Sequence, residues 1–207
     1  MNTPTRLAGL LLGSLLMCSG MTSAFAADNV IKPTRGTIES VNDSSMQITT
    51  RQGDKLDVKL TDQTKINAVT KGQISDIKAD SFIGTAAVPQ ANGTLKALEV
   101  HVFAPSLRGS GEGFNPFESA DGKINTMTNG TVGKLVNTNG RTLTVKYHDA
   151  EKTVLVPDDV PVVLLAPGDR SLLKPGTKIV LFAMKDDKGA LVARGIAAGK
   201  DGVAPPM

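Results

Sequence analysis

The sequence predicts an all-β fold of two tandem small OB-like β-barrels, with about five strands each, behind a cleaved signal peptide. Three observations lead to this fold class. Apolar residues alternate with polar residues at a spacing of two, turn-forming residues separate the alternating segments, and most of the chain reads as one module written twice. Short strands at regular intervals in two copies are typical of small closed barrels.

The repeat is carried by four pairs of similar segments whose offset stays near one value, at about 92 to 96 positions. Insertions between the copies are therefore small, and we expect them in loops. The copies predict barrel modules over 35–104 and 130–200, an interdomain segment over 105–129 and a tail over 201–207. The matched pairs are 36–38 with 130–132, 58–62 with 154–158, 83–85 with 175–177 and 92–97 with 188–193.

The first 26 residues have the organisation of a secretory signal peptide. Arg6 supplies the positive start, residues 7–17 the apolar stretch, and Ala24-Phe25-Ala26 a small-residue cleavage site. We expect a periplasmic protein that begins at Ala27 and has no membrane span after cleavage. The single cysteine, Cys18, leaves with the signal, so disulfides are not expected to stabilise the mature chain.

The predicted strands are the alternating segments, since alternation places one face on a core and the other in water. Between the third and fourth strand of each copy, residues 74–78 and 170–173 predict one helical turn. This order suits an OB barrel, in which closure removes exposed edges, and a pair of small β-sandwiches is the alternative. The strands are 36–41, 46–50, 55–60, 83–88 and 95–103 in the first copy, and 131–136, 142–147, 152–156, 178–184 and 191–197 in the second.

The interdomain segment combines glycines with two aromatic residues, Phe114 and Phe117, and two opposite charges, Arg108 and Glu112. Flexible linkers rarely carry aromatic residues. One interpretation is a loop that folds over the barrels and presents Arg108 and Glu112 to a ligand. The other is a linker whose two phenylalanines dock on a module and have no further role.

Composition argues against a polyanion-binding protein. The chain has 23 basic and 20 acidic residues, and aromatic residues make up only 3% with no tryptophan, so nucleic acid is not an expected partner. No phosphate loop, paired-histidine helix, cysteine pair or serine elbow occurs, and no cofactor is predicted. The sequence therefore offers no recognisable catalytic set.

The two histidines, His101 and His148, are the candidate metal ligands, with Met127 or Met184 as a soft partner. The competing interpretation is structural. His101 lies between two valines of a strand and is then expected to point outward, while His148 lies in a polar turn where histidine is ordinary.

Five segments of the chain are distinctive: 99–103, 107–113, 127–129, 168–173 and 199–207. Together they resemble a family of exported proteobacterial proteins that contain a small β-domain of unknown function and are often labelled metal ABC transporter permeases. The resemblance implies a periplasmic location and an OB-like fold, but no activity or catalytic residues. A permease needs several spanning helices, which this sequence lacks. Residues 114–117 depart from the family, which has a His-Arg-Pro-Trp type run there.

Three classes of function follow from these patterns. The first is a non-enzymatic periplasmic binding or adaptor protein, because small barrels commonly present loops to partners. The second is a metal or small-ligand carrier whose interdomain groove uses Arg108, Glu112, His101 or Arg170. The third is an enzyme with Ser110 or Ser171 beside a histidine. The partner is expected to be a periplasmic protein or a small ligand, and the oligomeric state stays open.

Overall fold

A computed structural model describes residues 32–135 and 141–206, and this part of the chain is all-β. The predicted signal peptide lies outside the described residues. The strands are joined edge to edge in one continuous sheet, with three short 3₁₀ helices between them. The strands are β1 (Thr34–Val41), β2 (Ser45–Thr50), β3 (Lys55–Lys59), β4 (Lys65–Lys71), β5 (Phe82–Pro89), β6 (Leu95–Ala97), β7 (Val100–Phe103), β8 (Gly113–Glu118), β9 (Ile124–Leu135), β10 (Thr142–Tyr147), β11 (Ala150–Leu155), β12 (Val162–Pro167), β13 (Lys178–Lys185) and β14 (Leu191–Gly199), and the helices are η2 (Ile74–Asp76), η3 (Pro105–Leu107) and η4 (Arg170–Leu172).

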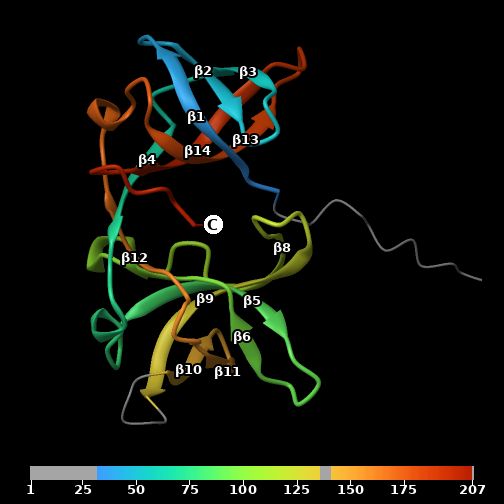
Figure 1. Cartoon of the computed structure of the whole chain (residues 1–207), viewed down its shortest axis with the longest axis vertical. Coiled ribbons are helices and arrows are strands. Elements are labelled where there is room, and N and C mark those ends of the chain that lie inside the picture. The colour runs from blue at the N-terminus through green and yellow to red at the C-terminus, as the bar shows by residue number, and fades with distance from the viewer. Residues whose placement is uncertain (1–31, 136–140, 207) are drawn as a thin grey trace, which may run out of the picture.

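The sheet closes on itself in two places, which gives two lobes (Figure 1). In the first ring, β13, β1, β2, β3 and β14 follow one another, and pairing between β13 and β14 completes the circuit. In the second ring, β5, β6, β11, β10 and β9 do the same, and β5 pairs with β9. Each ring has one parallel junction, between β3 and β14 and between β6 and β11. The predicted all-β class with a closed barrel is confirmed.

The rings do not follow the predicted module boundaries of 35–104 and 130–200, because each ring takes strands from both copies. The first copy gives β1 to β3 to one ring and β5 and β6 to the other, and the second copy supplies the complementary strands. The tandem arrangement is therefore wrong in its connectivity. The copies exchange their C-terminal strands.

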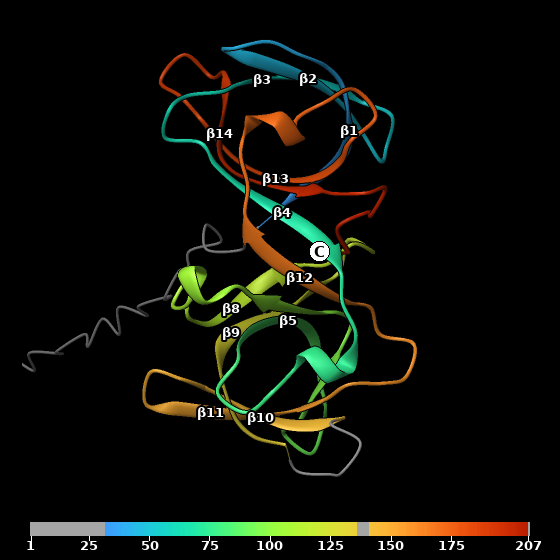
Figure 2. The ribbon, with the colours of Figure 1, turned by 90° about the vertical axis from the view of Figure 1, so that its left-hand side faces the viewer.

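The exchange is made by β4 and β12, which cross side by side between the lobes (Figure 2). They pair antiparallel from Asn67 with Pro167 to Lys71 with Val163, and their outer edges pair parallel with β14 and β7. Alternation predicts no strand at these positions, because β12 is an almost continuous apolar run and β4 alternates poorly. A strand that is covered on both faces loses the period of two.

Other predictions hold locally. The predicted helical turns fall on η2 and η4, and each of the ten predicted strand segments overlaps an observed strand. The segment 95–103 is two strands, β6 and β7, and β4, β8 and β12 have no predicted counterpart. Gly93 and Gly189 occupy matching hairpin turns with φ of 82° and 79°, which confirms that pair of the repeat. The pair 83–85 with 175–177 is wrong, since Gly84 is inside β5 while Gly176 lies in the turn before β13.

The apolar side chains form three clusters rather than two. One fills each ring, around Ile38 and Leu181 in the first and around Ile83 and Leu143 in the second. The third lies between the rings and includes Phe117, which is 1% exposed. Burial of one such side chain contributes about 1.5 to 3 kcal/mol, so the inter-ring cluster holds the lobes together.

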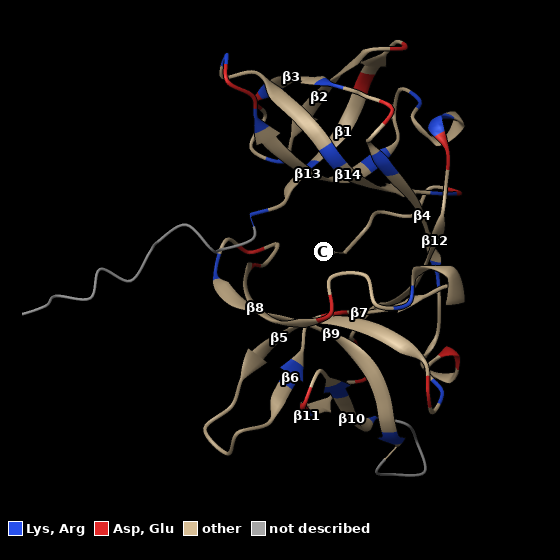
Figure 3. Cartoon of the chain, turned by 180° about the vertical axis from the view of Figure 1, so that it is seen from behind, with Lys and Arg blue, Asp and Glu red and all other residues tan. Residues whose placement is uncertain are grey.

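Charged residues of both signs occur on both lobes (Figure 3). In the part of the chain that the structure describes, no helix is long and apolar enough to cross a membrane.

Candidate functional site

The candidate site is a pocket of about 230 Å³ at the junction of the two rings, here called the inter-ring pocket. Strands of both rings and the crossing strands form its walls, and the segment before β8 covers one side. Most of the lining is apolar, with His101, Asn129, Asn67 and Ser110 as polar exceptions. The residues are Asn67, His101, Phe103, Ser110, Gly111, Phe117, Met127, Asn129, Leu165, Phe182, Gly195, Ile196 and Ala197.

His101 is buried in this junction, and the prediction that it points outward is wrong. Its side chain is 2% exposed, and its ring meets the Phe103 ring edge-on with centroids 4.9 Å apart. Side chains of β7 do alternate between two faces, since Val100 faces the core of the second ring. The opposite face of β7 is not solvent, however, because the first ring packs over it.

Glu99 lies two residues before His101 on the same face and is also 2% exposed. Its Oε1 is 3.3 Å from His101 Nδ1, within hydrogen-bond distance. A carboxylate is an acceptor only, so the tautomer that fits this contact carries its proton on Nδ1 and leaves Nε2 with a free lone pair. The pair fixes both the ring orientation and the tautomer of His101.

Gly84 makes room for this side chain. It pairs with His101 on one side and with Asn129 on the other. A Cβ at position 84 would overlap His101 Nε2 and Asn129 Oδ1, so these two atoms lie side by side over the glycine. Glycine is required here for close approach rather than for backbone freedom.

Asn129 is oriented by the segment that covers the pocket. Its Nδ2 donates to the carbonyl oxygen of Gly111 at 3.0 Å and to that of Ser110 at 3.4 Å. Oδ1 therefore points the other way, toward His101. The described residues contain three buried side-chain oxygens or nitrogens with no hydrogen-bond partner: Glu99 Oε2, Asn129 Oδ1 and Thr128 Oγ1. Of these three, Asn129 Oδ1 belongs to a residue that lines the pocket, and Glu99 Oε2 belongs to the partner of His101.

Arg35 of the first ring reaches across to the second. Its Nη2 donates to the carbonyl oxygen of Glu118 at 2.9 Å, and its guanidinium lies 5.9 Å from the centre of the Phe117 ring. Burial lowers the pKa of Arg35 and repulsion from Arg51 adds to this, while the charges of Glu99 and Glu118 raise it. Backbone carbonyl oxygens thus hold the Arg35 guanidinium at the junction, with Glu99 and Glu118 favouring its charged form.

The predicted binding arginines lie elsewhere. Arg108 donates to the carbonyl oxygen of Asp80 and, at 3.2 Å, to Thr131 Oγ1. Arg170 donates to the carbonyl oxygens of Asp43 and Thr61, at 3.1 Å for the latter, in the other lobe. Each arginine ties a loop to its own ring, and the structure does not bring the two together.

The remaining predicted residues separate in the same way. Glu112 Oε1 accepts a hydrogen bond from the backbone N–H of His148 at 3.0 Å. Phe114 is 38% exposed and stacks on Tyr147, with ring centroids 6.1 Å apart. Phe117 lines the inter-ring pocket. Both aromatic residues dock, but only Phe117 contributes to the candidate site.

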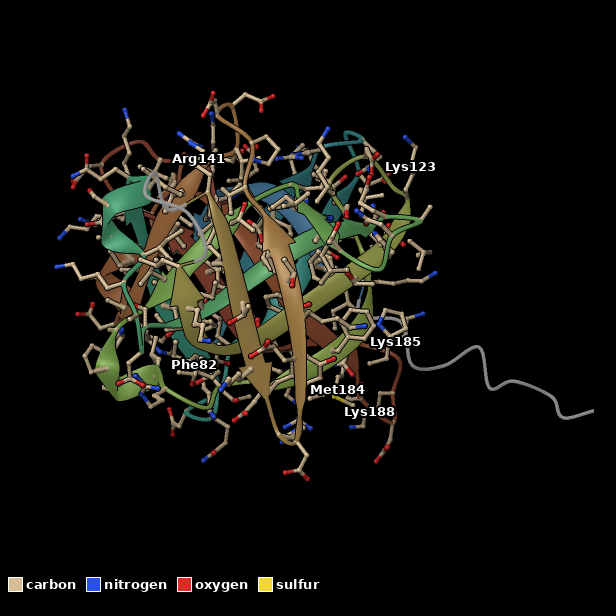
Figure 4. The ribbon with its side chains drawn as sticks, turned by 90° about the horizontal axis from the view of Figure 1, so that it is seen from below. Phe82, Lys123, Arg141, Met184, Lys185 and Lys188 are labelled. Atoms are coloured by element: carbon tan, nitrogen blue, oxygen red, sulfur yellow. The ribbon has the colours of Figure 1, made fainter. Side chains whose placement is uncertain are left out.

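The proposed metal ligands do not assemble. His148 lies in the β10–β11 turn with its backbone N–H held by Glu112, while His101 is buried beside Glu99. Met127 lines the pocket, but Met184 is 57% exposed at the periphery of the molecule (Figure 4). The described residues contain no group of three or more His, Cys, Asp or Glu side chains suited to one metal ion.

A larger hollow of about 490 Å³ lies beside η2 and the C-terminal tail. Its Arg141 and Asp158 already form an ion pair at 2.6 Å, and the rest of its wall is largely aliphatic. The smaller inter-ring pocket is the stronger candidate because the buried Asn129 Oδ1 has no hydrogen-bond partner among the described residues and lies beside His101 Nε2.

Sequence reasoning missed Glu99, Gly84, Asn129 and Arg35. A signal existed for Glu99, because a carboxylate two residues from a histidine on a strand shares its face. Asn129 lines the pocket, Gly84 lies beneath Asn129 and His101, and Arg35 contacts Phe117 from the first ring. These positions depend on pairing between distant strands, and nothing local marks them. No family model, curated protein or solved structure matches this chain, so the chemistry of the inter-ring pocket carries the functional argument.

Proposed function

We propose that this protein is a non-enzymatic binding protein that carries a small molecule in the inter-ring pocket. The observation that supports it is a buried polar pair, His101 Nε2 and Asn129 Oδ1, in a cavity whose other walls are largely apolar. Concave apolar pockets with a few convergent polar groups are the usual form of small-molecule sites. An unsatisfied buried acceptor costs about 1 to 3 kcal/mol, which a bound donor removes.

The size of the pocket suits a compact ligand. A dry cavity of about 150 Å³ holds benzene, so the inter-ring pocket, at about 230 Å³, accommodates a molecule of one or two rings. The pocket lies at the junction of two lobes, a frequent location for ligand sites. Export to the periplasm is the accompanying proposal, from the pattern of residues 1–26.

Binding is favoured over catalysis by the surroundings of His101. A nucleophilic mechanism needs a hydroxyl or thiol within hydrogen-bond reach of the histidine. Ser110 is the only serine that lines the inter-ring pocket within the described residues, and it presents its carbonyl oxygen to Asn129. A histidine that is held by a carboxylate and lies beside an amide oxygen is arranged to accept a hydrogen bond from a ligand.

The test is a screen of small ring compounds against the protein without residues 1–26, with thermal unfolding as the first readout and ¹H–¹⁵N NMR to locate binding. Gly195 lines the pocket, and a Cβ there meets nothing closer than Phe182 at 3.8 Å. Gly195→Leu is therefore expected to fill the pocket without unfolding the chain, and Gly195→Ala is the matched control.

Compounds that stabilise the parent and the Gly195→Ala variant, perturb the amides around His101 and fail with Gly195→Leu support the proposal. A screen without binders, or binders that Gly195→Leu leaves unaffected, contradicts it. A ligand at one hundred times its dissociation constant adds about 2.7 kcal/mol, which is readily measured.

An adaptor role is the second candidate, and β8 is the observation in its favour. Among the described residues this strand pairs only with β9 and ends the sheet, with the stacked Phe114 and Tyr147 beside it. Crosslinking in the periplasm from position 114 is expected to capture one defined protein, whereas an absence of crosslinks argues against this role.

A further inference from the structure

We infer that the inter-ring pocket selects neutral ring compounds that carry one N–H or O–H donor, which lies between His101 Nε2 and Asn129 Oδ1. This inference rests on the proposed function and specifies the chemical class of the ligand. Three properties of the site lead to it: two adjacent acceptors, apolar aromatic walls and, among the described residues, a lining without carboxylates.

The two acceptors are fixed by their own partners. Glu99 Oε1, 3.3 Å from His101 Nδ1, selects the tautomer with the proton on that nitrogen, since the other tautomer would set a lone pair against a carboxylate. The carbonyl oxygens of Ser110 and Gly111 take both bonds that Asn129 Nδ2 donates. His101 Nε2 and Asn129 Oδ1 are thus two acceptors that lie side by side over Gly84.

A donor placed between two neighbouring acceptors satisfies at least one of them, whereas an acceptor or a purely apolar group leaves both unpaired. Sites built with buried polar groups reject analogues that lack the matching group, because the site's own atoms then lose their hydrogen bonds. Discrimination in this pocket therefore depends on the presence of the donor rather than on ligand size.

The walls specify the rest of the ligand. Phe103, Phe117 and Phe182 approach the pocket from β7, β8 and β13, with Met127 beside them. Aromatic rings and a thioether favour a flat apolar body. A cationic head gains little, because the described residues that line the pocket include no carboxylate.

The experiment compares indole with benzofuran, two bicyclic compounds of the same shape that differ in whether the ring heteroatom is an N–H donor or an oxygen acceptor. NMR titration of the chain without its first 26 residues is expected to show indole binding at least about tenfold more tightly. In Asn129→Leu the preference is expected to shrink, since one acceptor is gone. Gly195→Leu is expected to block both compounds.

Because Asn129→Leu also releases the segment before β8, a second measurement uses the unaltered side chains. The ¹⁵N resonances of His101 are expected to show the neutral tautomer with its proton on Nδ1, and Nε2 is expected to shift when indole is added. An imidazolium without ligand, or an unchanged Nε2 at saturating indole, would overturn the inference.

Equal affinity of indole and benzofuran for the pocket overturns the donor requirement and leaves the proposed function intact. If neither compound binds while other compounds of the screen do so in a Gly195→Leu-sensitive way, the ligand class is wrong but the binding function stands. If no compound of the screen binds, both fail.

Discussion

The two rings are built from equivalent strands, but they present different residues to the space between them. In the second ring, Gly84 is flanked by His101 and Asn129. In the first ring, the corresponding place on β13 is taken by Val180, flanked by Ala197 and Arg35.

The difference lies in how the volume is used. Val180 and Ala197 pack in the apolar inter-ring cluster. In the second ring, Gly84 has no side chain, so the imidazole of His101 and the amide of Asn129 occupy the equivalent space. The two related rings thus carry different side chains at equivalent positions, and the pocket between them has its polar atoms on the side of the second ring.

The strongest test of this comparison makes the second ring resemble the first. Gly84→Val is expected to lower the free energy of unfolding by about 3 kcal/mol or more, because its side chain overlaps His101 and Asn129. Urea denaturation measures the loss. Gly195→Ala, which meets no close neighbour, is the control, and a Gly84→Val variant within about 0.5 kcal/mol of the parent would contradict this packing.

A double-mutant cycle sharpens the comparison. His101→Ala alone is expected to cost about 3 kcal/mol, since it leaves a cavity and a buried Glu99 without its partner. In Gly84→Val with His101→Ala, valine occupies the vacated space, as Val180 does beside Ala197. The double variant is expected to be at least about 1 kcal/mol more stable than the sum of the single effects predicts. Additive losses would mean that the two positions do not share space.

A smaller effect is expected from the loop arginines, which act alike in the two lobes. Arg108→Ala and Arg170→Ala each remove hydrogen bonds from a partly exposed side chain to backbone carbonyls. Each is expected to cost about 1 kcal/mol in urea denaturation and to leave ligand affinity unchanged. If either variant kept its fold but lost ligand binding, that arginine would belong to the binding site after all.

The smallest expected effect is a pH dependence confined to one hairpin. A hydrogen bond from the Lys59 side chain, with further bonds from the backbone N–H groups of Ala190 and Lys188, lowers the pKa of Asp186 in the β13–β14 turn. A lowered carboxyl pKa means that the stabilisation is present above the ordinary Asp pKa of about 4 and is lost as pH falls through the lower folded value.

Gln90 holds the corresponding place in the β5–β6 turn. Its backbone N–H donates to the carbonyl oxygen of Thr94, just as the backbone N–H of Asp186 donates to the carbonyl oxygen of Ala190. Below about pH 4, amide hydrogen exchange is expected to show the β13–β14 turn opening before the β5–β6 turn. Asp186→Asn is expected to remove the difference in pH response. Equal responses of the two turns in the parent would contradict the assignment.

The sequence by itself determined the secondary structure of most of the chain. Alternation with a period of two located ten strand segments, and glycines such as Gly93 and Gly189 marked matching turns, because these signals depend only on neighbouring residues. It also indicated that Phe117 docks. These features are local, and the duplication made each of them visible twice.

Only the tertiary structure decided which strands close each ring and which residues meet in the pocket. The exchange through β4 and β12 gives each ring strands from both copies, and the first ring buries the face of β7 that carries His101, with Glu99 just before the strand. Asn129 and Gly84 come together through pairing of β9 with β5. Backbone hydrogen bonds between strands form without regard to side-chain identity, so a local pattern reveals that a residue is in a strand but not which distant strand will lie beside it.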